Sequence, residues 1–243
     1  MSMTRLDKIL TDTGRCSRSK AKELIRAGSV RVNGAVVTDA AAKFDPEAVI
    51  VSVAGEQLEA PGHLYVMLNK PDGLLSASTD RNKPTVLDLM PAEWRKRGLF
   101  CVGRLDKDTT GLLLLTDDGE YAHKVISPKS CITKLYEAQV EGTAGEKDVQ
   151  AFRDGLTLRD GLHCLPAELI PLSPGRVRVE VMEGKYHQVK RMLASRELPV
   201  LQLRRRRIGS LWLDPALGSG EYRILTEEEI VLALTPLCRN DEH

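Results

Sequence analysis

The sequence predicts an α+β protein with a small N-terminal module, residues 1–60, and a larger domain, residues 61–243, built on a mainly antiparallel mixed sheet. Three observations support this prediction. Helical and strand-like patterns are mixed along the chain, apolar and polar residues alternate in many strands, and residues 55–63 form a linker-like stretch with proline and glycine. Such alternation favours antiparallel strands with one buried face, on which helices can pack.

The first sixty residues are typical of two helices followed by a small sheet. The apolar residues of TRLDKIL recur at helical spacing, and Ser17 is a good N-cap for a second helix over residues 18–27. Asn33 and Gly34 are a turn signal within VRVNGAVV, which predicts a hairpin. A third strand is expected over residues 49–53.

Strand-like runs with helical stretches between them follow the linker. We expect strands over residues 64–68, 99–102, 112–116, 135–140, 167–170, 177–182 and 200–207. We expect helices over residues 121–126, 146–154, 187–195 and 227–234.

Composition excludes several classes of protein. The 243 residues are 42% hydrophobic and 28% charged, so the chain is not disordered as a whole. No apolar run approaches the ~20 residues of a membrane span, and the N-terminus lacks the apolar core of a secretory signal. The five cysteines contain no CxxC pair, which favours free thiols. We therefore expect a cytoplasmic protein with no membrane partner.

Charge is strongly segregated although the net charge is only +1. Residues 1–31 carry eight basic and three acidic residues, and residues 184–209 carry eight basic residues and one acid. The last thirty residues carry seven acids and two arginines. This pattern favours a surface for a polyanion, although solvated helix faces would give it too. The basic residues around the second helix suit phosphate contacts along an RNA groove: Arg15, Arg18, Lys20, Lys22 and Arg26.

Two segments carry candidate chemistry. In GRLDKDTTGLLLLTDDG, Asp106 lies in a loop just before a very apolar strand, with Arg104 two residues earlier. A rigid buried strand can present such a carboxylate for catalysis, although loop aspartates mostly form turns. In EGKYHQVKRM, Lys190 could keep a nearby carboxylate ionised, or simply lie on a solvated helix.

Two further segments are less specific. Tyr136, in KLYEA, could stack on a nucleobase, but a tyrosine in a strand is more often part of the core. The segment LNKPDG has the composition of a turn.

These four segments, in this order, resemble the motifs of pseudouridine synthases of the ribosomal small-subunit type. The N-terminal stretch, TRLDKIL to VRVNG, resembles the α-L RNA-binding module of a small-subunit ribosomal protein. The resemblance implies an enzyme that flips one uridine out of 16S ribosomal RNA and isomerises it to pseudouridine. The implied partner is this RNA or a small-subunit assembly particle, and we expect a monomer.

The resemblance also implies a role for each site residue. Asp106 matches the essential aspartate, Tyr136 the tyrosine that packs on the target base, and Lys190 the basic residue that pairs with the aspartate. Val189 matches the apolar residue beside that lysine, and Arg104 a residue that fills the space left by the flipped base. The NKPDG segment matches a structural motif beneath the site.

The implied reaction needs neither a cofactor nor a metal, because nothing is oxidised and no group comes from outside. The sequence agrees, since it has no Walker loop and no Rossmann fingerprint, and the pair His163 and Cys164 is too sparse for a metal site. The aspartate could act as a nucleophile toward the sugar or as a base, and the sequence leaves both open.

Two other functions would also account for part of the sequence. A non-catalytic RNA-binding or ribosome-assembly protein would explain the basic module but not the acid at position 106. A carboxylate hydrolase would need a second carboxylate at the site, for which Asp108 or Asp117 could be nominated.

Overall fold

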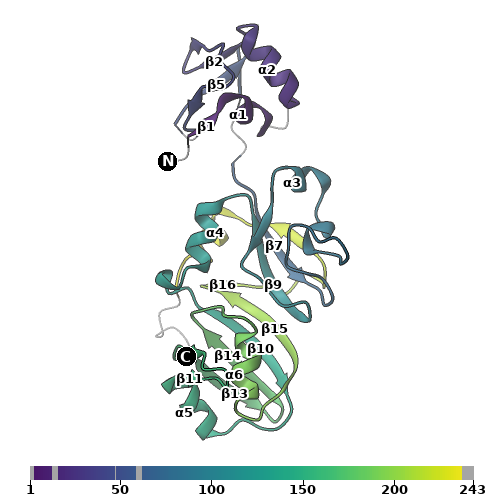
Figure 1. Ribbon diagram of the computed structural model, residues 1–243, viewed down its shortest axis with the longest axis vertical. Helices are drawn as coiled ribbons and strands as arrows, with labels where there is room; N and C mark the ends of the chain where they lie inside the picture. The colour runs from purple at the N-terminus through teal and green to yellow at the C-terminus, as the bar shows by residue number, and fades with distance from the viewer. Residues whose placement is uncertain (1–2, 13–15, 47, 59–61, 237–243) are drawn as a thin grey trace. The chain divides into compact units, whose positions relative to one another are not determined.

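The computed structural model describes residues 3–12, 16–46, 48–58 and 62–236. The chain divides into two compact units, Met1–His63 and Leu64–His243, and each is described by itself (Figure 1). Within the described ranges, no helix has both the length and the apolar character needed to cross a bilayer.

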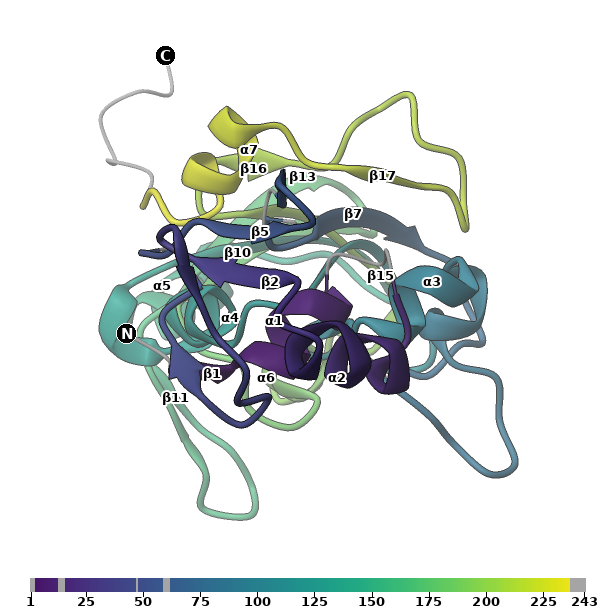
Figure 2. The same cartoon turned by 90° about the horizontal axis from the view of Figure 1, so that it is seen from above.

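The N-terminal unit packs two helices beside each other against a four-stranded antiparallel sheet of order β3-β2-β5-β6 (Figure 2). A two-stranded pair, β1 with β4, completes it. The elements are α1 (Leu6–Asp12), α2 (Arg18–Arg26), β1 (Thr4–Arg5), β2 (Val30–Val32), β3 (Ala35–Val36), β4 (Lys43–Phe44), β5 (Val51–Val53) and β6 (Glu56–Leu58).

Local sequence signals explain most of this unit. The Ser17 side chain accepts a hydrogen bond from the Lys20 amide at 3.3 Å and so caps α2, as predicted. Asn33 and Gly34 both have positive φ angles, which is the geometry of the tight hairpin that their sequence predicts. The prediction of a linker over residues 55–63 was wrong for its first residues, which form a turn and a strand. Ala54 and Gly55 adopt positive φ angles as a second hairpin turn, so the next residues pair with β5 as β6.

The larger unit is built on a nine-stranded mixed sheet of order β13-β14-β10-β15-β9-β7-β17, with β16 added to β15 and β8 to β9. The strands are β7 (Tyr65–Lys70), β8 (Phe100–Val102), β9 (Thr109–Thr116), β10 (Lys134–Val140), β13 (Glu168–Ser173), β14 (Arg176–Val181), β15 (Val200–Ile208), β16 (Leu211–Trp212) and β17 (Tyr222–Ile224). A separate pair joins β11 (Leu156–Thr157) to β12 (His163–Cys164).

The helices of this unit are short. They are α3 (Ala92–Lys96), α4 (Gly119–Ile126), α5 (Glu146–Asp154), α6 (Gln188–Ala194) and α7 (Glu227–Leu232), with single 3₁₀ turns η1 (Val86–Leu89) and η2 (Pro128–Ser130). Every strand and helix predicted for this unit is present, although β9 begins earlier than expected, within the loop segment that contains Asp106. The short α3 was not predicted.

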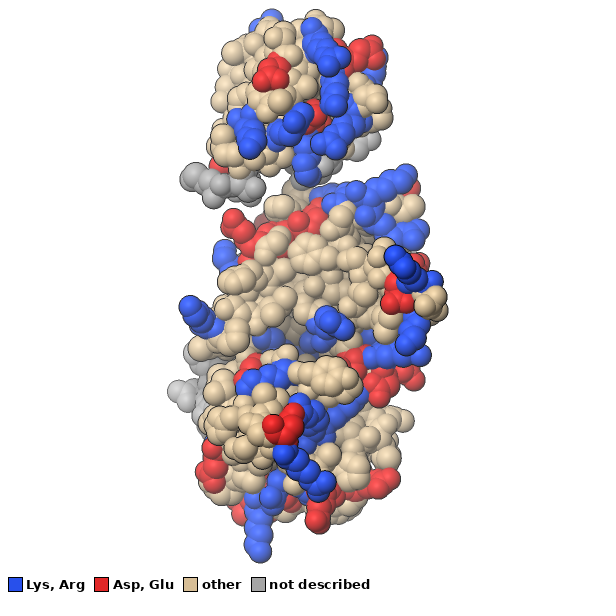
Figure 3. Space-filling model, in the orientation of Figure 1, with Lys and Arg blue, Asp and Glu red and all other residues tan. Residues whose placement is uncertain are grey.

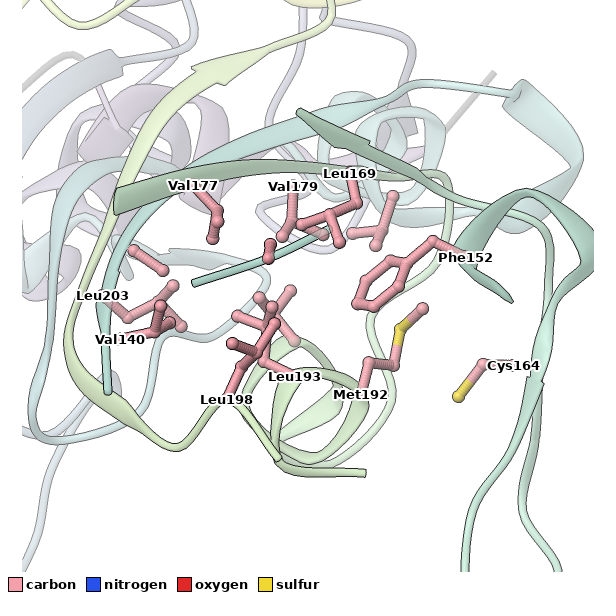
Figure 4. Close-up of a cluster of buried hydrophobic side chains, with 14 of the residues drawn as sticks. Val140, Phe152, Cys164, Leu169, Val177, Val179, Met192, Leu193, Leu198 and Leu203 are labelled. Atoms are coloured by element: carbon pink, nitrogen blue, oxygen red, sulfur yellow. The ribbon is translucent and has the colours of Figure 1, made fainter. Parts of the chain in front are cut away.

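A buried apolar cluster fixes α6 to the sheet (Figure 4). Met192 and Leu193 of α6 are fully buried, and they meet Phe152 of α5 and Val179 of β14 in this cluster. Burial of such side chains contributes on the order of 1.5–3 kcal/mol each. The packing therefore holds the helix that carries Lys190 in a defined position.

One strand pair joins the two halves of the sheet. Among the described strands of this sheet, only β9 and β15 run parallel, with Gly111 opposite Arg205. Gly111 has a φ of +99°, and a Cβ added there would lie 2.2 Å from the Arg205 carbonyl oxygen. This close approach requires glycine at the centre of the sheet.

We expect Gly111→Ala to destabilise the protein by at least about 2 kcal/mol, because it combines backbone strain with a clash against backbone. Urea denaturation measures the change. Gly119→Ala is the matched control: Gly119 begins α4, has no positive φ, and has open space around the added Cβ. A Gly111→Ala variant as stable as Gly119→Ala would show that β9 and β15 can move apart at little cost.

Candidate active site

A cleft in the larger unit gathers the five catalytic-domain residues that the sequence singled out. The loop before β9, strands β10 and β14, and α6 with the turn before it line this cleft, which has a volume of about 420 Å³ with its opening to solvent included. The five residues among its lining are Arg104, Asp106, Tyr136, Val189 and Lys190.

The Asp106 carboxylate is half-buried and lies between two side chains from the α6 region. Lys190 Nζ is 3.1 Å from Asp106 Oδ2, and His187 Nε2 is 3.4 Å from Asp106 Oδ1. The ion pair with Lys190 brings together the two groups that the sequence predicts as partners. His187 was not predicted, although it stands within the EGKYHQVKRM segment.

Lys190 bridges two carboxylates rather than one. Its Nζ also lies 2.5 Å from Asp108 Oδ1, whose side chain is 70% exposed, against 26% for Asp106. Desolvation opposes the charge on Lys190, but the hydrogen bonds to Asp108 and Asp106 outweigh it and raise the pKa of the lysine. The hydrogen bond from Lys190 also lowers the pKa of Asp108. Lys190 is therefore held as a cation at the cleft.

Tyr136 faces the cleft from β10 and is backed by a buried arginine. Arg205, opposite it on β15, is 4% exposed, and its Nη1 donates to Tyr136 Oη at 3.4 Å. Arg205 Nε donates to the Leu112 carbonyl at 2.7 Å, while Nη2 finds no hydrogen-bond acceptor among the described protein groups. A buried cation with no carboxylate beside it leaves positive potential behind Tyr136. In the sequence, Arg205 is distinguished only as one of the eight basic residues of 184–209.

A buried lysine fixes the loop that carries Asp106. Lys70 is fully buried at the end of β7, and its Nζ donates to the carbonyls of Pro71 at 3.0 Å, Lys107 at 2.9 Å and Thr109 at 3.0 Å. Ser76 Oγ holds the same loop through both the amide and the carbonyl of Leu105. The two anchors enclose Asp106 on either side in sequence, so its backbone is strongly restrained.

The two remaining residues of the predicted set occupy the border of the cleft. Arg104 is exposed, and Val189 is 5% exposed with its side chain in the core cluster that also contains Met192. Asp117, nominated as a second carboxylate, pairs with Arg97 at 2.8 Å and accepts from the Leu64 amide. It does not belong to the cleft lining.

The basic residues predicted for RNA contact lie on the N-terminal unit. Arg18, Lys22 and Arg26 are spaced four residues apart on α2 and so form one row, and Figure 3 shows Lys and Arg side chains gathered over this helix. Lys20 lies on another side and pairs with Glu23 at 2.8 Å. Arg15 lies outside the described residues.

The second basic segment, residues 184–209, presents less free positive charge than its number of basic residues suggests. Six of its eight basic residues pair with acidic side chains: Lys185 with Glu183, Lys190 with Asp106 and Asp108, Arg191 with Asp160, Arg196 with Asp148, Arg206 with Glu137, and Arg207 with Glu180. Most of this charge is therefore neutralised within the protein, and the polyanion surface expected there is much reduced.

No group of three or more metal-ligating side chains is present among the described residues. His163 and Cys164, a pair too sparse in the sequence to predict a metal site, form the short strand β12.

Burial lowers the pKa of Lys70 to about 8, from an ordinary value of 10.5. Between these values the unfolded chain binds a proton that the folded protein does not, so this residue's contribution to the free energy of unfolding rises with pH. We expect the stability of the wild type relative to Lys70→Met to increase from pH 8 to 10, by at most about 1.4 kcal/mol per pH unit.

Urea denaturation of both proteins at several pH values measures this difference, with the exposed Lys124→Met as the control. Parallel stability curves for the wild type and Lys70→Met would contradict the assigned burial of the charge.

Comparisons with known proteins agree with this fold. The model of the RNA pseudouridylate synthase family matches residues 64–195, and the S4 domain model matches residues 4–50. A pseudouridylate synthase crystal structure superposes with a TM-score of 0.68 at 37% identity, covering 94% of this chain and 99% of that one. The fold class predicted from the sequence is thus confirmed.

Two relatives match nearly end to end. The chain is 40% identical to an uncharacterised RNA pseudouridine synthase, YtzG, of Bacillus subtilis (strain 168), covering 96% of this chain and 99% of the relative. It is also 40% identical to ribosomal small subunit pseudouridine synthase A of Escherichia coli (strain K12), covering 93% of this chain and 98% of the relative. With its cleft, its two units and these matches, the chain belongs to the RNA pseudouridylate synthase family.

Proposed function

We propose that this protein isomerises a uridine of 16S ribosomal RNA to pseudouridine, with Asp106 as the catalytic carboxylate. One observation carries the proposal: Asp106 is held in a cleft by a doubly anchored loop, with the Lys190 ammonium 3.1 Å away and Tyr136 in the same cleft. The similarity to the small-subunit synthase of Escherichia coli over nearly the whole chain supports the choice of RNA.

The chemistry fits these groups. The C1′–N1 bond of uridine breaks, the base turns and C5 bonds to C1′. C5 then loses its hydrogen to solvent as a proton, and N1 takes up a proton from solvent. An ionised Asp106 can add to C1′ or remove a 2′ proton, and both roles need a fixed carboxylate. The Lys190 ammonium compensates the negative charge of the Asp106 carboxylate and orients that carboxylate. All heavy atoms of the product come from the substrate and one proton is exchanged with solvent, so the reaction needs no cofactor.

The target base must leave its stack to reach this cleft. We propose that Tyr136 packs on the extruded uracil and that Val189 supplies an apolar contact beside Lys190. Arg205 supports the tyrosine from below through its bond to Oη. Because Arg104 is exposed at the cleft border, it can occupy the space that the flipped base leaves.

The N-terminal unit supplies affinity in this proposal. The cations Arg18, Lys22 and Arg26 form a row on α2, and such a row can contact successive phosphates along an RNA groove. The match to the S4 domain model supports RNA as the partner of this unit. We propose that the enzyme works as a monomer in the cytoplasm, where ribosomal RNA is made and assembled, on free 16S RNA or on a small-subunit assembly particle.

The two other functions are less well supported. A non-catalytic binding protein does not require the doubly anchored Asp106 loop. A hydrolase would need a second carboxylate in the cleft, but Asp108 is largely exposed and Asp117 is held by Arg97. Glu183 does line the cleft, yet its oxygens are taken by the Leu165 amide, Gln188 and Lys185.

We expect Asp106→Asn to lower the rate of pseudouridine formation by at least about 10³-fold, because a positioned acid–base or nucleophilic group contributes on this scale. Release of tritium from RNA labelled at uridine C5 measures the rate. Asp108→Asn is the matched control, since Asp108 shares Lys190 but is absent from the cleft lining, and it should keep most of the activity. Near-normal turnover by Asp106→Asn would exclude the catalytic role.

We expect the triple change R18A/K22A/R26A to weaken RNA binding and to reduce the slope of log Kd against log salt by about 2–3. Each lost phosphate contact releases roughly one counterion fewer. Filter binding across a salt series measures this slope. Lys20→Ala, which removes a lysine paired with Glu23, should change it less. An unchanged slope in the triple variant would show that this row does not contact phosphates.

A further inference from the structure

An exposed aromatic side chain stands beside the cleft and has no part in the proposed reaction. Tyr186 is 76% exposed, the highest value among the large hydrophobic side chains of the described residues. Exposure on this scale leaves apolar ring surface in water, which is unfavourable unless a partner covers it.

Tyr186 is nevertheless ordered by its neighbour. Its ring stacks on that of His187, with the centroids 3.8 Å apart and the planes 18° from parallel. Since one face of Tyr186 lies on His187 and the side chain is still largely exposed, the other face is open to solvent. The pair thus presents a flat aromatic surface.

The backbone holds this pair against the catalytic carboxylate. His187 is in the left-handed region with a φ of 50°, which is uncommon for a residue other than glycine. The buried Glu183 accepts from Gln188 at 2.8 Å, and the Lys185 amide donates to Gln188 Oε1 at 2.9 Å. These bonds fix the turn, and His187 Nε2 then lies 3.4 Å from Asp106. His187 therefore contacts Asp106 and carries Tyr186 stacked on its ring.

Charges near the stack show which ligand suits it. Lys185 and Arg191, the flanking cations of the segment, are paired with Glu183 and Asp160 at 2.9 and 2.5 Å. The segment therefore offers no unpaired cation in these two positions for a phosphate, but it does offer an open aromatic face. Such a face binds a planar, largely uncharged ring, and base-on-aromatic stacking is sequence-tolerant.

We propose that Tyr186, backed by His187, is a stacking platform for a nucleobase adjacent to the target uridine. This inference rests on the proposed function, because it needs a uridine held at Asp106. A base on the outer face of Tyr186 extends the aromatic stack by one ring. It places its nucleotide next to the one in the cleft and keeps the flanking strand splayed while the target base is turned.

The test combines protein variants with RNA in which single bases are deleted. Wild type, Tyr186→Ala and Tyr186→Phe are compared by kcat/KM for tritium release, using RNA with an abasic site at each position flanking the target. We expect Tyr186→Ala to lower kcat/KM by about 5- to 100-fold on intact RNA, the range that base stacking gives, and Tyr186→Phe to stay near wild type.

The decisive result is that the effects of Tyr186→Ala and of one abasic site on kcat/KM do not combine. One flanking abasic site should reduce the wild-type rate as much as Tyr186→Ala does, and should cause no further loss in the Tyr186→Ala variant. Thermal unfolding of both variants should match that of the wild type, because the side chain is exposed.

Three outcomes would overturn the platform. The first is multiplicative losses at every flanking position, which would show that Tyr186 acts only through His187 and Asp106. The second is a Tyr186→Phe variant as impaired as Tyr186→Ala, which would show a hydroxyl contact in place of stacking. The third is an unimpaired Tyr186→Ala. Failure of the wild type to release tritium from any 16S RNA would instead overturn the proposed function, and this inference with it.

Discussion

The parallel pairing of β9 with β15 is the constraint on which the cleft depends. It joins the half of the sheet formed by β7, β9 and β17 to the half formed by β10, β14 and β13. The loop with Asp106 leaves the first half, whereas Tyr136 and the α6 segment with Lys190 belong to the second. The Asp106 carboxylate, which we propose as the catalytic group, and its partners therefore meet across this junction. The contact at Gly111 is so close that the distance between the two halves is fixed by backbone atoms.

Buried cations stiffen the same region. Lys70, Lys134 and Arg205 are all nearly inaccessible, and each donates to backbone carbonyls. Desolvation makes such groups unfavourable, and burial lowers the pKa of Lys134 to about 8, as it does for Lys70. What they provide is a set of fixed hydrogen bonds: Lys70 donates to the loop that carries Asp106, Lys134 to α4 and Arg205 to β9. Arg205 also leaves positive potential behind Tyr136, at the cleft that we propose receives an RNA strand.

The sequence predicts the elements far better than the contacts. Period-two alternation and capping residues such as Ser17 act locally, so strands and helices could be placed to within a few residues. The short strand β6 was missed because its turn uses Ala54 in a positive-φ conformation, which the residue type does not indicate. Asp106, Tyr136 and Lys190 were found through a family resemblance, since spacing alone does not distinguish a catalytic aspartate from a turn. His187 and Arg205 could not be found, because their importance lies in tertiary contacts.

The structure distinguishes two groups of basic residues that a count of charges in the sequence treats alike. On α2 three cations, Arg18, Lys22 and Arg26, follow one helix face at intervals of four residues, and of these Arg18 also lies 3.9 Å from Asp7. In residues 184–209 most cations instead meet acids of the same unit, as Arg207 of β15 pairs with Glu180 of β14 across the intervening strand β10. Paired cations contribute little to the field that attracts a polyanion. This distribution of charge supports the proposal that the N-terminal unit supplies most of the affinity for RNA. In the proposed function the cleft recognises its substrate through shape, stacking and the exposed Arg104, a combination suited to admitting a single extruded base.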